Sequence, residues 1–378
     1  MNICVVGLRG LPHVMGGVET HCAQLFPLLA KIRPNDSFTI IGRRAYLSSV
    51  ISQYEGLWIV SLAHAGGKNL ETITNTLYGV LYAHFVLHAD LVHLQGIGPG
   101  LLAPFAKALG MKVVVTYHSK NYQHRKWSRF ARLMLRVGEL SALTFADRVI
   151  AVSRSLATDL RRRFPRAAAK VHFIPNGANH IIKGAAAIVA REECLAKYGL
   201  TEGKYIIAVG RLVPEKGFHD LIAAFKESVN GYKLVIVGDA DHRDTYSESL
   251  RRESAEAVIF TGFVGHDTLR SLLESASLFV LPSYNEGLPI AALEAAVLRV
   301  PILLSDIEPN RDLGLEARNY FKLGDVDDLK NKLAEDHCRY RVDPERLLQQ
   351  YDWDAIGAET AKLYSTLQTE YPGGNQPR

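Results

Sequence analysis

Short apolar segments alternate with helical patterns along almost the whole chain, and this alternation constrains the fold more than any other feature. The apolar segments of the first half are ICVV, SFTII, LVHL, KVVVTY, RVIAV and KVHFIP, and those of the second half are YIIAVG, KLVIVG, AVIFTG, SLFVLP and VPILLS. Continuous apolar strands are buried on both faces, as in parallel sheets that have helices on either side. The sequence therefore predicts an α/β protein made of two successive doubly wound domains.

Length and charge distribution agree with two domains. A chain of 378 residues is too long for one compact core. Residues 1–180 contain 21 Lys and Arg but only 8 Asp and Glu, so the formal charge of +5 for the whole chain leaves an acidic second half. The β/α alternation is interrupted at PNGANHIIKGAAA, where Pro, Asn and Gly cluster. We expect a first domain over residues 1–178 that has an anionic partner, and a second domain over residues 179–352.

A further helix is expected after the second domain. Within WDAIGAETAKLYSTL, four residues recur at helical spacing: Ile356, Thr360, Leu363 and Leu367. We predict that a helix over residues 353–368 packs back on the first domain. The polar, Gly- and Pro-containing residues 369–378 are typical of a disordered tail.

Membrane-spanning, disulfide-linked and zinc-binding proteins fit the sequence poorly. The chain opens with MNICVVGLRG, which indicates a strand and a glycine turn rather than a signal peptide. Residues 72–89 contain no Asp, Glu, Lys or Arg, but Asn75, His84 and His88 favour a helix buried in the α/β layer over a membrane span. The four cysteines form no C-x-x-C pair, so we expect a cytoplasmic protein without disulfides or zinc.

Ligands of doubly wound folds bind at the carboxyl ends of the parallel strands, so the loops there are of interest. The first such loop, GLRGLPHVMGGVETH, contains Gly16 and Gly17 directly before a predicted helix. Their bare backbone would let an anionic ligand approach the helix N-terminus, although a plain tight turn explains them equally well. The spacing is not G-x-G-x-x-G and no acidic residue follows at the distance that would read a ribose. Both facts count against a dinucleotide oxidoreductase.

Two further loops carry a histidine and a pair of cations. His118 follows the strand KVVVTY, where either a structural or a ligand-binding role is open. In AVGRLVPEKGF, Arg211 and Lys216 lie between Gly210 and Gly217. Two cations in a strand-end loop suit a diphosphate, because Arg binds as a fork and Lys as a point charge. The alternative is that both cations are solvated at the surface.

The fourth loop, PSYNEGLPIAALEAA, places Glu286 in a turn and Glu294 on an apolar helix. Pro289 suits the first helical turn, and the amides of Gly287 and Leu288 would then form an anion site at the helix N-terminus. A fixed carboxylate recognises paired hydroxyls, so Glu286 would reach sugar hydroxyls and Glu294 a ribose diol. The alternative for Glu286 is that it only caps the helix.

Together these motifs resemble the retaining family 4 glycosyltransferases. The specific part is the combination of R-x(4)-K, here Arg211 and Lys216, with E-x(7)-E, here Glu286 and Glu294. The resemblance extends over nearly the whole chain and includes the early GG, TYH midway, PNGA before the second domain and TGFVG within it. The opening GLRGLP and GGVET are also similar to a subgroup of rhamnosyltransferases.

The resemblance implies a GT-B architecture, in which two Rossmann-like domains face each other across a cleft. The first domain would bind the acceptor and the second the nucleotide sugar. In that family's terms, Arg211 and Lys216 hold the diphosphate, Glu294 holds the ribose, and Glu286 and His118 contact the transferred sugar. The other implied donor contacts are Gly16, Gly17, Gly210, Phe263, Val264, Gly287 and Leu288.

The implied reaction moves a hexosyl or deoxyhexosyl group, with retention, from a nucleoside diphosphate sugar to a glycan or a polyprenyl-diphosphate-linked acceptor. Such a step would belong to the synthesis of cell-surface polysaccharides. Cations and helix-end amides would stabilise the departing diphosphate, so we expect no metal and no cofactor. The D-x-D triplet at residues 239–241 follows a strand where the family has no metal site. Rival interpretations are a GT-B sugar-nucleotide epimerase, a starch- or sucrose-type synthase, and a non-catalytic nucleotide-binding module.

A basic stripe in HRKWSRFARLMLRV concerns the acceptor side. Four arginines fall on one face of a predicted helix: Arg125, Arg129, Arg132 and Arg136. The opposite face carries apolar residues: Trp127, Phe130, Met134 and Val137. In one interpretation the apolar face enters the core and the arginines are merely solvated. In the other the arginines hold the protein at the inner face of an anionic membrane or bind a lipid-linked acceptor. No nucleic-acid partner is expected, because no recognition motif is present and the second half is acidic.

Overall fold

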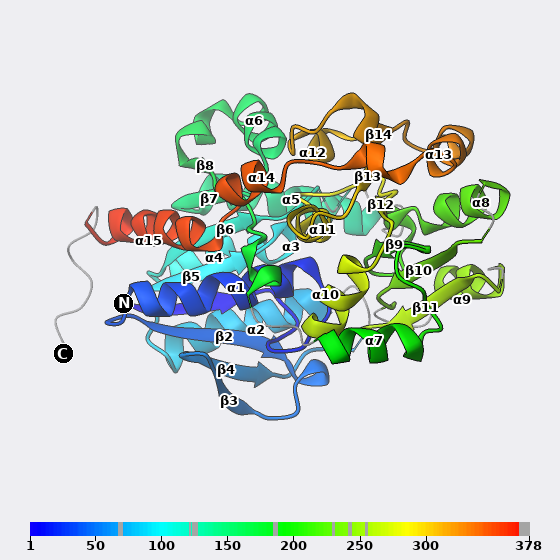
Figure 1. The fold of residues 1–378 in the computed structure, drawn as a ribbon. Helices are drawn as coiled ribbons and strands as arrows, with labels where there is room; N and C mark the ends of the chain where they lie inside the picture. The colour runs from blue at the N-terminus through cyan, green and yellow to red at the C-terminus, as the bar shows by residue number, and fades with distance from the viewer. Residues whose placement is uncertain are drawn as a thin grey trace. The chain divides into compact units, whose positions relative to one another are not determined.

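The structure is a computed structural model, which describes residues 1–66, 71–120, 122, 128–183, 188–228, 231–240, 244–253 and 256–369. The chain forms two compact units (Figure 1). Unit 1 comprises residues 1–176 together with 353–378, and unit 2 comprises residues 177–352. The chain thus enters unit 2 after Asn176, where the sequence predicted residue 178, and it returns to unit 1 at Trp353. Residues 370–378 of the predicted tail lie outside the described residues.

Unit 1 is built on an eight-stranded sheet with the order β3-β4-β2-β1-β5-β6-β7-β8, which can be followed in Figure 1 from β3 at one edge to β8 at the other. The strands are β1 (Asn2–Val6), β2 (Ser37–Arg43), β3 (Ile51–Tyr54), β4 (Leu57–Leu62), β5 (Leu91–Gln95), β6 (Lys112–Tyr117), β7 (Arg148–Ala151) and β8 (Val171–Phe173). All neighbouring strands are parallel except β3 and β4. The apolar pattern predicted every strand but this antiparallel pair. It missed β3 because this edge strand is largely exposed and has no continuous apolar run.

Helices cover both faces of this sheet. They are α1 (Gly17–Ile32), α2 (Glu71–Phe85), α3 (Ile97–Gly100), α4 (Ala103–Ala108), α5 (Arg129–Phe145), α6 (Arg154–Arg163) and α15 (Trp353–Thr369), with short 3-10 turns at Arg44–Tyr46 and Pro165–Lys170. Side chains alternate across a strand, and Val5 accordingly joins the core under α1 and α15, whereas Val6 meets Gly79 of α2 on the other face. A Cβ added at Gly79 would lie 2.7 Å from Cγ1 of Val6, so the glycine permits this close contact.

Two sequence predictions about helices of unit 1 can be compared directly with the structure. In α15, Ile356, Thr360, Leu363 and Leu367 are all buried, and this helix shares a core with α1. Within residues 72–89 the chain forms α2, which ends at Phe85 and buries one face only. Within the described part of the chain, no helix combines the length and the apolar character that a membrane span requires.

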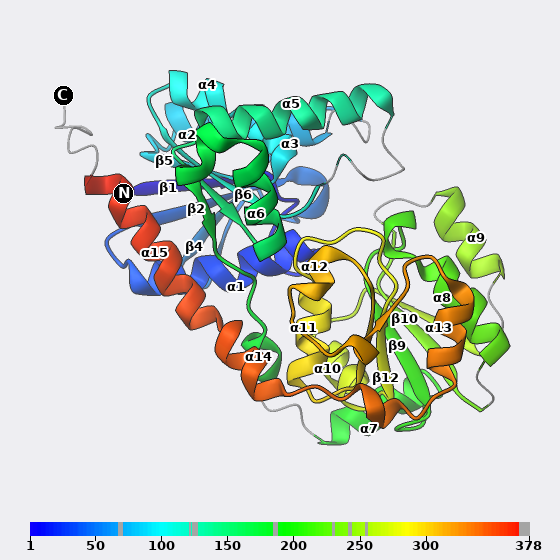
Figure 2. The same ribbon diagram turned by 90° about the horizontal axis from the view of Figure 1, so that it is seen from above.

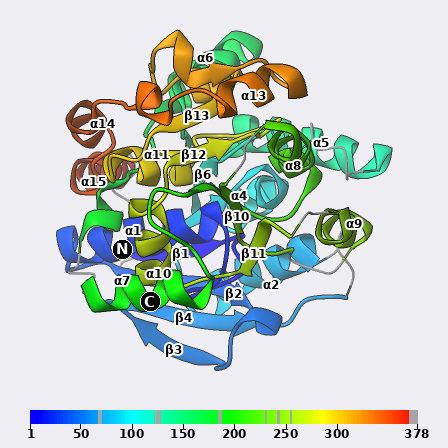
Figure 3. The same ribbon diagram turned by 45° about the vertical axis from the view of Figure 1, so that its right-hand side comes forward.

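Unit 2 contains a six-stranded parallel sheet with the order β11-β10-β9-β12-β13-β14, whose strands are labelled in Figure 1, and Figure 3 shows β10, β11, β12 and β13 from another side. The strands are β9 (Tyr205–Val209), β10 (Lys233–Val237), β11 (Val258–Gly262), β12 (Leu278–Leu281), β13 (Ile302–Ser305) and β14 (Tyr320–Phe321). The helices are α7 (Ile188–Lys197), α8 (Phe218–Ser228), α9 (Thr245–Glu253), α10 (His266–Glu274), α11 (Ile290–Val297), α12 (Glu308–Arg311), α13 (Val326–Leu333) and α14 (Pro344–Gln350). Single 3-10 turns lie at Asn179–Ile182, Pro214–Lys216, Ala317–Asn319 and His337–Tyr340. Residues of α8 and α13 share one core with β9, β10 and β12.

Helix α5 bears on the two interpretations that the sequence left open for the basic stripe. The helix begins at Arg129, with Ser128 as its N-cap, while Arg125 and Trp127 lie outside the described residues. Phe130 and Val137 do not enter the core, because their side chains are 72% and 39% exposed. The residues of α5 that are buried lie on another face of the helix: Gly138, Glu139, Ser141, Ala142 and Leu143. Of the two interpretations that the sequence left open, the one that places the apolar face in the core therefore fails for Phe130 and Val137, while Met134 is half-buried.

Candidate functional site

The loop after β9 and the loop before α11 meet through a lysine and a glutamate. Lys216 ends the 3-10 turn Pro214–Lys216, and its Nζ donates a hydrogen bond of 2.5 Å to Oε1 of Glu286. The two side chains are 20% and 10% exposed, so the ion pair is mostly shielded from solvent. An ammonium group has three N–H donors and a carboxylate has two oxygens, so this contact leaves both groups with further capacity for a ligand.

Backbone contacts hold these two loops at a fixed distance. Gly217 has a φ of +67°, and a Cβ added there would lie 2.0 Å from the carbonyl oxygen of Pro282. The amide of Tyr284 also donates to the carbonyl oxygen of Glu215, at 2.8 Å. Any residue other than glycine at position 217 would force the loops apart. The position of Lys216 relative to Glu286 is therefore set by the backbone rather than by the ion pair alone.

Gly210 and Arg211 directly follow β9. The amide of Gly210 donates to the carbonyl oxygen of Val237, and a Cβ added at Gly210 would lie 3.3 Å from Cε of Lys216. This glycine thus makes room for the lysine stem. Arg211 is half-buried beside it. The two cations that the sequence assigned to a diphosphate thus lie on one strand-end loop, directly after β9 and in the 3-10 turn Pro214–Lys216.

Helix α11 begins one residue later than predicted. Pro289 is its N-cap rather than a residue of the first turn, and a proline side chain offers the helix amides no hydrogen-bond acceptor. Glu286 accepts from Lys216, and the structure gives no support to the alternative in which Glu286 caps the helix. Gly287 and Leu288 are buried next to the N-terminus of α11. The positive end of the helix dipole therefore adds to the charge of this loop.

Glu294 lies on α11 and has a partner that the sequence did not predict. His180, in the 3-10 turn Asn179–Ile182, lies 2.8 Å from Oε1 of Glu294 through its Nε2. Both side chains are buried, at 6% and 7% exposure. An ionised carboxylate only accepts hydrogen bonds, so the contact requires the proton on Nε2 of His180. One oxygen of Glu294 thus already accepts a hydrogen bond before any ligand binds. The other oxygen is then the better placed to accept a hydrogen bond from a ligand hydroxyl.

Phe263 and Val264 follow β11 at the same end of the unit 2 sheet. The ring of Phe263 is 51% exposed, and Val264 is half-buried. A large exposed aromatic side chain at a strand end offers an apolar surface to a flat ligand group. Contact with a nucleotide base stays a prediction for these two residues.

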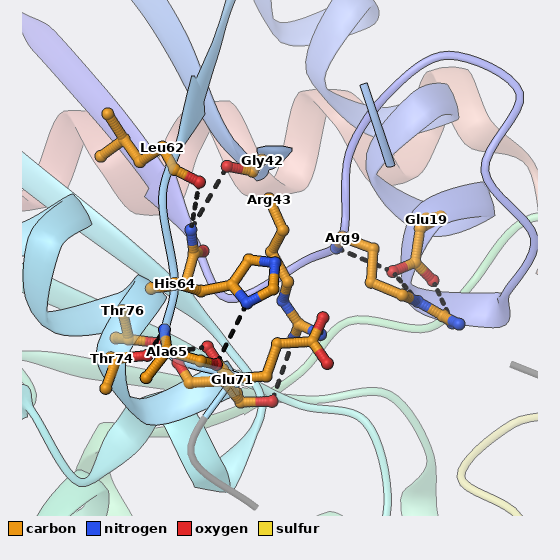
Figure 4. A network of polar contacts seen from close by, with 12 residues as sticks. Arg9, Glu19, Gly42, Arg43, Leu62, His64, Ala65, Glu71, Thr74 and Thr76 are labelled. Atoms are coloured by element: carbon orange, nitrogen blue, oxygen red, sulfur yellow. Dashed lines mark hydrogen bonds and ion pairs between the residues drawn. The ribbon is translucent and has the colours of Figure 1, made fainter. Parts of the chain in front are cut away.

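In unit 1, the absence of a side chain at Gly16 and at Gly17 has different structural consequences. Gly16 has a φ of +146°, and a Cβ there would lie 2.2 Å from Oε2 of Glu19 and 2.5 Å from Nη2 of Arg9. Arg9 and Glu19 form a two-point ion pair, with Nε to Oε1 at 3.1 Å and Nη2 to Oε2 at 3.2 Å (Figure 4). A Cβ at Gly17, by contrast, would meet nothing within 4 Å. The ion pair therefore packs directly against Gly16 and stabilises the turn, while the backbone at Gly17 borders open space.

His118 follows β6 and belongs to a group of histidines. Its ring meets the ring of His21 edge to face, with centroids 4.9 Å apart, and Nδ1 of His21 donates to Oδ1 of Asn176 at 2.9 Å. Burial lowers the pKa of His118 well below its usual range, and the nearby His21 and His93 lower this pKa further. Burial also lowers the pKa of His21 to about 4 and that of His93 to about 3. All three rings are therefore neutral at pH 7, and His118 is suited to hydrogen bonding rather than to acid catalysis.

Gln95 is a candidate that the sequence did not single out. It ends β5, and its Oε1 lies 2.9 Å from Nε2 of His118. The amide oxygen accepts the proton of Nε2, which leaves the lone pair of His118 on Nδ1. Nε2 of Gln95 is buried and has no hydrogen-bond partner among the described residues. Its place at the end of a parallel strand is the same signal that pointed to His118.

The acidic triplet at residues 239–241 shows no metal-binding arrangement in its described part. Oδ1 of Asp239 accepts from Nη2 of Arg251 at 2.9 Å and from the amide of Ala240 at 2.8 Å, while Asp241 lies outside the described residues. Among the residues that the structure describes, no group of three or more His, Cys, Asp and Glu is placed to hold a metal ion.

Comparisons with known proteins identify the family. Residues 15–180 match the family model Glycosyltransferase Family 4, and residues 190–335 match the model Glycosyl transferases group 1. The chain is 31% identical to the glycosyltransferase MJ1607 of Methanocaldococcus jannaschii, over 96% of this chain and 98% of that protein. It is 28% identical to alpha-D-kanosaminyltransferase of Streptomyces kanamyceticus, over 79% of this chain and 78% of that protein. The crystal structure of Anabaena Alr3699/HepE in complex with UDP-glucose has a TM-score of 0.76 and 20% identity, with 97% and 100% of the two chains covered.

Proposed function

Because the chain belongs to the family 4 glycosyltransferases and has their GT-B fold of two parallel-sheet units, we propose that it is a retaining, metal-independent transferase. The donor is a nucleoside diphosphate sugar, and the group transferred is a hexosyl or deoxyhexosyl residue. The acceptor is a glycan or a polyprenyl-diphosphate-linked saccharide of a cell-surface polysaccharide. The observation that carries the proposal is the strand-end loop of unit 2, where Lys216 is bonded to Glu286 and Arg211 lies on the same loop.

The diphosphate is the part of the donor that this loop suits best. Arg211 supplies a planar fork of N–H donors, and Lys216 has N–H donors left beyond its bond to Glu286. The N-terminus of α11 adds backbone amides to the same region. The similar Anabaena protein was crystallised in complex with UDP-glucose, which supports a nucleoside diphosphate sugar as the donor class.

The reaction breaks the bond between the anomeric carbon and the diphosphate oxygen, and it forms a bond from that carbon to the acceptor oxygen. Negative charge develops on the leaving oxygen, and Arg211 and Lys216 stabilise it. The acceptor attacks from the face that the diphosphate leaves, and its hydroxyl proton passes to the departing phosphate. The anomeric configuration is then retained without a protein nucleophile. Glu286 and the neutral His118 hold hydroxyls of the transferred sugar.

A donor screen tests this proposal. The purified protein is incubated with nucleoside diphosphate sugars that differ in base and sugar, each with and without a lipid-linked saccharide acceptor. Acceptor-dependent release of the nucleoside diphosphate and a product of unchanged anomeric configuration by NMR are expected. An isomerised nucleotide sugar would establish an epimerase, and ligand binding without any turnover would establish a non-catalytic module.

Metal independence leads to a separate prediction. Transfer is expected to survive treatment with EDTA at nearly its full rate, because protein cations and helix amides supply the positive charge at the leaving group. The measurement compares initial rates in EDTA with rates after Mg²⁺ or Mn²⁺ is restored. An absolute requirement for either ion would overturn this part of the mechanism.

Glu286→Gln is expected to separate turnover from nucleotide affinity. The substitution keeps the shape of the side chain and an acceptor for Lys216, so affinity for the free nucleoside diphosphate is expected to change by no more than about twofold. Hydrogen bonds to a charged group contribute about 1.5–3 kcal/mol, so loss of the carboxylate at the sugar is expected to lower kcat by about 10- to 150-fold. Calorimetry and steady-state kinetics measure the two quantities. A loss confined to nucleotide affinity would place Glu286 at the diphosphate instead.

A further inference from the structure

Helix α5 exposes a continuous row of large apolar side chains, which we call the apolar stripe. It consists of Phe130, Leu133, Val137 and Leu140, which are 72%, 58%, 39% and 54% exposed. Residues separated by three, four and seven positions lie on one face of a helix, so these four form a single surface. A stripe of this kind on one helix is more than the scattered apolar residues that soluble surfaces usually show.

The packing of α5 against its neighbours keeps the apolar stripe on the outer face of the helix. The helix lies against α3 and α4 of unit 1 (Figure 2). On the contact face, a Cβ added at Gly138 would lie 2.1 Å from the carbonyl oxygen of Ile97, and one added at Gly100 would lie 3.0 Å from Cβ of Ala142. Only small residues permit so close an approach. The helix therefore cannot turn the apolar stripe inward without losing this contact.

A buried carboxylate secures the same orientation. Glu139 is 2% exposed, and its Oε1 accepts from the hydroxyl of Tyr117 at 2.5 Å while its Oε2 accepts from Nη2 of Arg163 at 2.5 Å. Rotation of α5 about its axis would break these bonds and leave a charge unpaired in the interior, which is costly. Glu139 is also the one acidic residue within the helix.

The exposed charged residues of α5 itself are all positive. Arg129, Arg132 and Arg136 are exposed, and they lie on one flank of the stripe by helical register. The exposed surface of α5 is thus apolar and cationic, with its one carboxylate buried and paired. The part of the chain to which α5 belongs, residues 1–180, contains 21 Lys and Arg but only 8 Asp and Glu.

We propose that α5 lies in the headgroup region of an anionic lipid bilayer, with the apolar stripe among the acyl chains and the arginines at the phosphates. Amphipathic helices that have a basic flank bind bilayers in this way, and long arginine side chains reach back to the headgroups. A second copy of the chain fits this surface less well. A symmetric contact would bring the arginines of both copies to one interface that has no exposed carboxylate on α5 to pair with them. The inference is independent of the transfer reaction, although it would place the enzyme beside a lipid-linked acceptor.

Co-sedimentation with vesicles tests the proposal in the full chain. Wild type is expected to bind phosphatidylglycerol-containing vesicles and to bind neutral phosphatidylcholine vesicles at least tenfold more weakly. A variant with Phe130, Leu133, Val137 and Leu140 all changed to serine is expected to lose binding at every salt concentration. A variant with Arg129, Arg132 and Arg136 changed to glutamine is expected to lose the preference for anionic lipid. Phe85→Ser is the matched control, because Phe85 is 63% exposed at the end of another helix of unit 1.

Two further measurements make the result decisive. Thermal unfolding shows whether the serine variant is folded, and the single substitution Leu133→Asp, at an exposed position, provides a milder version of the same test. With Leu133→Trp, brominated acyl chains are expected to quench the new fluorescence. Wild-type binding by the serine variant, or no quenching at position 133, would overturn the proposal. A concentration-dependent dimer that the serine substitutions dissociate would assign the stripe to a second copy instead.

Discussion

Replacing Arg211 or Lys216 by alanine is expected to lower kcat by about 10²–10³, the effect of removing one preorganised donor from developing charge. Both side chains lie on the loop that follows β9, and Lys216 is already held by Glu286 at 2.5 Å before a ligand arrives. Because charge on the diphosphate oxygen grows as the sugar departs, the loss should appear in kcat more than in KM. Steady-state kinetics with the donor found in the screen measure it.

The matched control is Lys330→Ala. Lys330 belongs to the same unit and also pairs with a carboxylate, at 2.8 Å from Glu227, but this pair lies on the surface. Exposed ion pairs contribute about 0–1 kcal/mol to stability and nothing to a distant reaction. Turnover near that of wild type in both the Arg211 and Lys216 variants would remove these residues from the leaving-group site. The same loss in the Lys330 variant would indicate damage to the unit as a whole.

The strands could be predicted from the sequence because most of them are buried on both faces. A continuous apolar segment such as KVVVTY is typical of a central strand of a parallel sheet, and the structure confirms it as β6. The pattern failed where burial is one-sided or the strand is short. The exposed edge strand β3 and the two-residue β14 carry too little apolar sequence to be recognised.

The sequence could predict which loops carry the candidate site residues, but not which side chains contact each other. Position at a strand end identified Lys216 and Glu286 separately, whereas their contact depends on the backbone of Gly217 passing within van der Waals distance of Pro282. His180 was missed because it neither ends a strand nor belongs to a motif. It reaches Glu294 only through a 3-10 turn at the beginning of unit 2.

One of the two interpretations of α5 fails for a different reason. It used hydrophobicity to assign the large side chains Phe130 and Val137 to the core, but close helix packing depends on small side chains at the contact. Gly138 and Ala142 make the contact with the neighbouring short helix, and the large residues are left outside. A stripe of small residues at helical spacing was therefore the better signal for the buried face.

The second large effect is expected on nucleotide affinity, from Glu294. Glu294→Gln should weaken binding of the free nucleoside diphosphate by about 10- to 150-fold, since a hydrogen bond from a hydroxyl to a charged group contributes about 1.5–3 kcal/mol. His180 occupies one oxygen of this buried carboxylate, so we expect the other oxygen to make the main contact with the ribose. Calorimetry with the nucleoside diphosphate alone measures the loss without the complication of turnover.

His180 extends this prediction to a residue that would act only through Glu294. His180→Ala should let the carboxylate turn away from the ribose and weaken nucleotide binding, whereas His180→Gln offers an amide N–H in a similar place and should restore much of the affinity. A ligand that lacks the ribose hydroxyls distinguishes this role of His180 from a merely structural one. With the 2′,3′-dideoxy nucleoside diphosphate, wild type and His180→Ala should bind equally, because the contact with the ribose hydroxyls is then absent from both.

The matched control is His337→Ala, which removes another buried histidine of the same unit, bonded to Ser277 and to the carbonyl oxygen of Leu333. That variant should lose stability but keep the full preference for ribose over dideoxyribose. If His180→Ala also keeps this preference, the histidine only supports the fold and Glu294 needs no help to read the sugar.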